Sequence, residues 1–82
     1  MHEVAVAAGI LDAVRLEAAA RKPARAVKVG VRIGEMAGID PESLAFCFEA
    51  LVKGMNLEPL ELEIERGSAD ELEFCYLELE PT

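Results

Sequence analysis

Hydrophobic positions in the first quarter of the chain recur at three- and four-residue steps, which aligns them on one face of an α-helix. The predicted inward positions are Val4, Ala7, Leu11, Val14 and Ala18. A proline stands at position 23 and cannot continue a helix. We therefore expect a helix from residue 4 to residue 21.

The next segment, residues 24–34, alternates between hydrophobic and polar positions, as a half-buried β-strand does. Val27, Val29, Val31 and Ile33 would share the inward face. Residues 34–39 then read as a loop.

A second helix is expected to begin after Asp40, because aspartate is a favoured N-cap and Pro41 suits the first helical position. Its inward face would carry Leu44, Cys47, Phe48, Leu51 and Met55. Gly54 is the expected end, since glycine tolerates the left-handed conformation that often closes a helix.

Alternation returns in the last third of the chain and predicts two more strands. In the first of them Leu60, Leu62 and Ile64 would face inward and Glu61, Glu63 and Glu65 outward. Residues 66–70 read as a turn, and residues 71–80 as the last strand. The alternation slips near Cys75, which predicts either a β-bulge or an exposed apolar patch.

These elements predict one α+β domain over residues 1–82, with two helices packed on one face of a three-stranded mixed sheet in the order α-β-α-β-β. A right-handed crossover would make the first two strands parallel. Two strand orders stay open. Placing the strand with Lys28 and Arg32 in the centre would separate the glutamate-rich strands, whereas the short link at residues 66–70 favours a simple hairpin.

The chain is strongly acidic, with sixteen acidic residues, eight basic residues and a formal net charge of −8. Such a surface repels nucleic acid and anionic membranes, so we expect neither as a partner. The longest apolar stretch, near residues 4–10, is too short to span a bilayer, and no cationic signal region precedes it. We expect a cytoplasmic protein.

The sequence predicts neither a structural zinc site nor an enzyme. Cys47 and Cys75 form no Cys-x-x-Cys pair, so we expect no structural zinc within one chain. The sequence also lacks a nucleophile elbow, a phosphate-binding glycine loop and a second histidine, so we expect no enzyme.

The one histidine, His2, follows the initial methionine directly. The terminal amine of Met1, the backbone nitrogen of residue 2 and the imidazole can close fused chelate rings around one cation, and Glu3 can supply a fourth ligand. Such nitrogen-rich planar sets suit Ni(II) and Cu(II) better than Zn(II). The alternative is that His2 belongs to a frayed chain end.

Asp40 has two interpretations. It is a good helix N-cap, and a carboxylate at that position could also reach a metal held by the start of the first helix. Glu35 and the glutamate rows of the last two strands are interpreted as solvated side chains.

Three segments together resemble the HypA/HybF family of hydrogenase nickel-incorporation proteins. They are the opening Met-His-Glu, the central run from Ile33 to Leu44, and the strand from Leu60 to Ile64. The stretch from residue 71 to residue 80 is similar to the closing strand of that family.

The resemblance implies a metallochaperone that delivers Ni(II) for maturation of [NiFe] hydrogenase. The implied nickel ligands are Met1, His2, Glu3 and, by extension, Asp40. The implied partners are the GTPase HypB and the hydrogenase large subunit. The alternative is an adaptor that keeps the HypA-like docking surface but delivers no metal.

The chain departs from this family in one region. Family members carry a zinc domain with two Cys-x-x-Cys pairs between the last two strands, where this chain has only residues 66–71. The short link there also makes a homodimer formed by strand exchange an open expectation.

Overall fold

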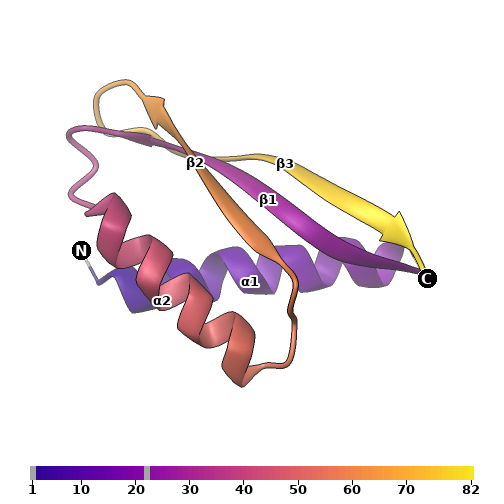
Figure 1. Ribbon diagram of the computed structural model, residues 1–82. Helices are drawn as coiled ribbons and strands as arrows, with labels where there is room; N and C mark the ends of the chain where they lie inside the picture. The colour runs from indigo at the N-terminus through magenta and orange to yellow at the C-terminus, as the bar shows by residue number, and fades with distance from the viewer. Residues whose placement is uncertain (1, 22) are drawn as a thin grey trace.

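The computed structural model describes residues 2–21 and 23–82 and contains two helices and three strands. In chain order these are α1 (Glu3–Ala20), β1 (Ala24–Gly34), α2 (Pro41–Gly54), β2 (Glu61–Gly67) and β3 (Leu72–Pro81). Both helices lie on the same side of the sheet (Figure 1). The predicted α+β fold and its element order are confirmed.

Strand β1 lies in the centre of the sheet, parallel to β2 on one side and antiparallel to β3 on the other. The order that separates the glutamate-rich strands is thus confirmed, and the hairpin alternative is wrong. Opposite charges meet across the strands: Lys28 Nζ lies 3.3 Å from Glu63 Oε2, and Arg32 Nη1 lies 3.1 Å from Glu73 Oε1.

The link between β2 and β3 crosses directly over the end of β1, at Gly34. The backbone N–H of Gly34 donates to the carbonyl of Glu71 at 2.8 Å, and that of Met36 donates to the carbonyl of Ala69 at 2.8 Å. A Cβ atom on Gly34 would lie 2.1 Å from the carbonyl oxygen of Ala69. Only glycine fits under this crossing without moving the backbone.

The predicted irregularity in β3 is a β-bulge. Gly30 pairs with Tyr76 and Val31 pairs with Phe74, so Cys75 is the extra residue on β3. The bulge restores the inward direction of the apolar side chains on both sides of it. On the opposite face of the sheet the Tyr76 ring lies over Gly30, where a Cβ would be 2.0 Å from the ring.

The core lies between the helices and β1. Its largest fully buried side chains are Phe48, Leu11, Leu44, Val29 and Val31. Among the described residues no buried side chain is polar or charged. The structure bears out the predicted inward positions 29, 31 and 33 of β1 and those of the Leu60 segment. Val27 was also predicted to face inward, which is wrong: the register of β1 against β3 shifts between Ala26 and Lys28, and Ala26 packs against the core instead. The helices show two further exceptions.

The first exception is Val4, which is 57% exposed, while Ile10 is buried in its place. The buried stripe of α1 begins one turn later, at Ala7, and Glu3 in the first turn contacts the start of α2. The second exception is Met55, which follows the end of α2 and is 37% exposed.

Helix α2 ends at Gly54, as predicted, but that glycine does not supply the left-handed residue. Asn56 does, with φ of 58°, and its N–H donates to the carbonyl of Lys53. Asparagine is, after glycine, a common residue in this conformation.

No helix in residues 2–21 or 23–82 combines the length and the apolar character needed to cross a bilayer.

Candidate metal site

The first turns of the two helices meet through Glu3 and Asp40, which are 37 positions apart in the chain. The backbone N–H of Asp40 donates to the Glu3 carboxylate, with N and Oε2 3.1 Å apart. Asp40 is the N-cap residue of α2, so the carboxylate of Glu3 lies at the positive end of that helix. The closeness of the two helix starts can be followed in Figure 1.

This contact lowers the pKa of the Glu3 carboxyl. The hydrogen bond from the Asp40 N–H is the largest cause that holds the pKa of the Glu3 carboxyl below its usual value, and a bond from its own backbone adds to it. Desolvation and the nearby Asp40 carboxylate act in the opposite direction but do not prevail. Glu3 is therefore an anionic oxygen donor at neutral pH.

Asp40 occupies the predicted N-cap position, but its carboxylate makes no capping bond to the backbone. Instead Oδ2 accepts a hydrogen bond from the Ser43 hydroxyl at 2.7 Å. Helix α2 starts through the carbonyl of Asp40, which accepts from the Leu44 N–H at 2.9 Å. The exposed carboxylate of Asp40 is thus positioned by Ser43 rather than by the helix backbone.

His2 is the N-cap residue of α1, with φ of −87° and ψ of 111°. Its carbonyl accepts from the Val6 N–H at 3.2 Å, so its backbone belongs to the helix start. Its exposed side chain makes no capping bond. The imidazole therefore has no role in the local structure that would compete with binding a ligand.

The predicted site consists of Met1, His2, Glu3 and Asp40, and the structure bears on three of these. Met1 lies outside the described residues. Glu3 and Asp40 are brought together, whereas no group of three His, Cys, Asp or Glu side chains that could hold a metal occurs within residues 2–21 and 23–82. The predicted set also uses an amine and a backbone nitrogen, so it stays a prediction.

The donors on these residues fit a borderline divalent cation. An imidazole and backbone or terminal nitrogens are donors that Ni(II) and Cu(II) prefer, and the carboxylates add anionic oxygens. Their charge also favours a cation over a neutral ligand.

A second charged cluster lies on the open face of the sheet, around Arg32. Its guanidinium lies 3.7 Å from Glu65 Oε2, 3.8 Å from Glu71 Oε2 and 3.1 Å from Glu73 Oε1. Because the guanidinium lies among the carboxylates, we interpret this cluster as an ion-pair network on the solvent-exposed face of the sheet.

The two cysteines are free and half-buried, at separate places. Desolvation is the largest cause that raises the pKa of the Cys75 thiol, against an opposing effect of Arg32. The thiolate is the form that binds metals, and this shift disfavours it in the free protein.

The role of Ser43 was not predicted. The spacing Asp40-x-x-Ser43 could have predicted this hydrogen bond, since residues three apart at a helix start lie side by side. The Glu3–Asp40 bond could be predicted only in part, because it depends on the crossing of two helices that are distant in sequence.

Comparisons with known proteins relate this chain to one family. The family model described as "Hydrogenase/urease nickel incorporation, metallochaperone, hypA" matches residues 1–76. A hydrogenase maturation factor HypA of Chlorobium limicola is 45% identical over 69 residues, which cover 84% of this chain and 60% of that protein. The HypA of Methanopyrus kandleri is 44% identical over 69 residues, covering 82% of this chain and 49% of that protein. The chain thus spans about half to three fifths of the length of these relatives.

A solved structure has the same fold. The solution structure of the Ni metallochaperone HypA from Helicobacter pylori matches with a TM-score of 0.72 at 18% identity, over 93% of this chain and 72% of that one.

Proposed function

The chain belongs to the HypA family, and from this we propose that it binds Ni(II) at its N-terminus and delivers the ion for maturation of a [NiFe] hydrogenase. The observation that supports the site most directly is the bond from the Asp40 N–H to the Glu3 carboxylate, which ties the start of α1 to the start of α2.

In this proposal the ligands are Met1 through its amine, His2 through its imidazole and backbone nitrogen, and Glu3 or Asp40 through a carboxylate. Each nitrogen must lose its proton to bind, so nickel uptake releases protons and weakens as the pH falls. Ser43 positions the Asp40 carboxylate, and the Asp40 N–H donates to the Glu3 carboxylate and lowers its pKa.

Delivery requires that a receiving protein reach the ion. His2 and Asp40 are exposed, and the donors of an incoming protein can therefore replace them one at a time. We propose the GTPase HypB and the hydrogenase large subunit as partners, in the cytoplasm. Nickel is the cargo in this scheme, and the chain performs no reaction of its own.

Structural zinc lies outside this proposal. Only residues 68–71 join β2 to β3, and the two cysteines lie on different elements. The proposal therefore assigns no docking role to a zinc domain.

Isothermal calorimetry with Ni(II) tests the proposal on three forms of the chain. These are the chain with its native terminus, His2→Ala, and a chain extended by residues before Met1. Asp12→Asn serves as the control because Asp12 is an exposed carboxylate of α1 far from the helix start. We expect one nickel ion to bind to the native form and the control, and binding to weaken at least about tenfold in the other two.

Equal affinity in all forms would reject the site. If the forms that bind nickel and the forms that do not bind nickel associate equally well with a HypB-type GTPase, the chain would instead be the adaptor without metal delivery.

A further inference from the structure

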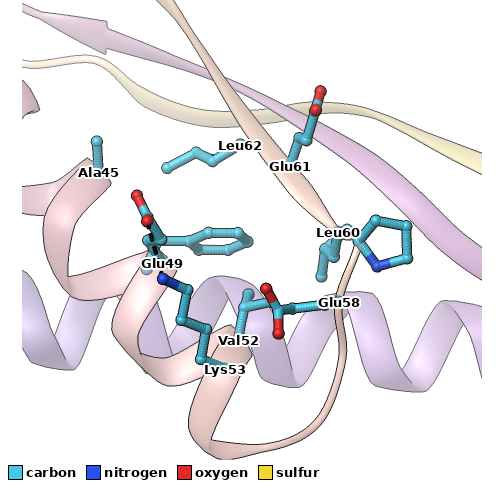
Figure 2. Close-up of a pocket in the computed structure, with 10 residues that line it drawn as sticks. Ala45, Glu49, Val52, Lys53, Glu58, Leu60, Glu61 and Leu62 are labelled. Atoms are coloured by element: carbon cyan, nitrogen blue, oxygen red, sulfur yellow. Dashed lines mark ion pairs between the residues drawn. The ribbon is translucent and has the colours of Figure 1, made fainter.

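A groove runs along the outer side of α2, between this helix and the edge strand β2 (Figure 2). It has a volume of about 460 Å³ and lies on the side of α2 lined by Ala45, Glu49 and Lys53. The residues proposed to bind nickel do not line it. The proposed function assigns no role to this groove.

The floor of the groove is apolar. Phe48, Val52 and Leu60 line it and are 2%, 3% and 7% exposed, and Leu62 is half-buried beside them. Figure 2 shows Leu62 pointing from β2 toward α2. An apolar side chain that enters the groove would therefore meet the core.

The rim of the groove is acidic. Glu49, Glu58 and Glu61 are exposed around it, with one cation, Lys53, whose Nζ lies 3.4 Å from Glu49 Oε1. Over residues 2–21 and 23–82 no ion pair joins Glu58 or Glu61 to a basic side chain. Two of the three rim carboxylates are thus available to a cationic partner.

Strand β2 forms the wall of the groove and an edge of the sheet. It pairs with β1 on one side, and in the described sheet no strand pairs with its other side. Such an edge presents backbone N–H and C=O groups that an added strand can use. Hydrogen-bonding groups, an apolar floor and an acidic rim therefore lie together.

We propose that this groove docks an extended, basic segment of a partner protein, which adds as a strand beside β2. Its apolar side chains would lie over Val52 and Leu60, and its lysine or arginine side chains would pair with Glu58 and Glu61. Alternation of the two kinds of side chain is what a strand provides.

Charge selects this occupant over a second copy of the chain. Another copy carries the same net charge of −8 and brings the same carboxylates to the contact. A basic segment gains attraction from both the rim and the whole molecule.

The test is an NMR titration of the full chain with an alternating Lys-Val peptide as the probe. We expect amide shifts on β2 and α2, and an affinity about tenfold weaker for the double variant Glu58→Lys/Glu61→Lys. The charge-matched control is the double variant Glu35→Lys/Glu78→Lys, at two exposed glutamates that do not line the groove. It changes the net charge by the same amount and should leave most of the affinity.

A second pair of variants leaves all charges unchanged, and one of the two fills the groove. Ala45→Trp should block the probe, whereas Ala19→Trp, at an exposed position of α1, should not. Shifts confined to β3 and α1, or equal losses of affinity in Glu35→Lys/Glu78→Lys and Glu58→Lys/Glu61→Lys, would overturn the proposal and show only general attraction to an acidic protein. Either result leaves the nickel proposal unaffected, because the probe carries no metal.

Discussion

The carboxylate of Glu3 accepts a hydrogen bond from the backbone N–H of Asp40, so the first helical residue of α1 is held at the N-cap of α2. Glu3 follows His2 directly in the chain, and this contact brings Asp40, with the second carboxylate, to the start of α1. The proposed nickel site is built around this bond.

Replacing Asp40 by asparagine separates metal binding from helix capping. Asparagine caps helices as well as aspartate does, and the carboxylate makes no capping bond here, so the melting temperature should change little. Nickel affinity should fall by about tenfold, because an anionic donor is lost. Calorimetry and thermal unfolding of the same sample measure both effects. Asp12→Asn is the control, and an unchanged affinity in Asp40→Asn would remove Asp40 from the site.

Gly34→Ala should destabilise the fold. The added Cβ would lie 2.1 Å from the Ala69 carbonyl and 2.5 Å from that of Ser68, so the link between β2 and β3 must move. We expect a loss of about 1–3 kcal/mol in the free energy of unfolding, measured by urea titration.

The matched control for this change is Gly9→Ala. Gly9 lies within α1, and a Cβ there meets no atom within 4 Å. This variant should gain about 0.5–1 kcal/mol, because alanine favours a helix interior over glycine. Equal stability of the two variants would mean that the link does not lie over Gly34.

Tyr76 should ionise at unusually high pH. Its hydroxyl donates a hydrogen bond to the Glu63 carboxylate, and this bond, with desolvation and the charge of Glu63, raises the pKa of Tyr76 to about 12 from 10.0. Because the folded value lies above the unfolded one, the stabilisation is complete below pH 10 and is lost as the pH rises toward 12.

The absorbance of tyrosinate reports this ionisation without overlap, since the chain has one tyrosine and no tryptophan. Glu63→Gln should lower the pKa of Tyr76 toward its ordinary value, while Glu61→Gln, at the neighbouring outward position of β2, should leave it nearly unchanged. Equal titration curves in the two variants would show that Glu63 does not hold the hydroxyl.

Periodicity in the sequence predicted the elements well, because each helix and strand buries a single face. The stripe of Ala7, Leu11 and Val14 and the alternation at Val29 and Val31 both follow directly from helix and strand geometry. The slip near Cys75 predicted either a β-bulge or an exposed apolar patch, and the structure has the bulge, since one extra residue reverses the alternation.

Contacts between distant segments could not be predicted in the same way. The need for glycine at position 34 depends on where the link crosses, and that in turn depends on β1 being central. The exposure of Val4 has a similar cause, because the periodic stripe cannot show where a helix extends past the core.

The candidate site was predictable as chemistry but only partly as geometry. His2 and Glu3 were selected from their place next to the chain start, and Asp40 from its place before Pro41. The contact between Glu3 and Asp40 requires both helices to start at the same end of the molecule, which local patterns do not encode. The strand-exchanged dimer and the partner proteins stay predictions.

The most direct test of the central claim is visible absorption spectroscopy of the chain with its native terminus during addition of one equivalent of Ni(II). We predict the absorption band of a planar, low-spin nickel complex, which saturates at one ion per chain and is absent in His2→Ala and in the N-terminally extended form. Only the weak bands of an octahedral nickel ion, or an identical planar band in all three forms, would contradict the account.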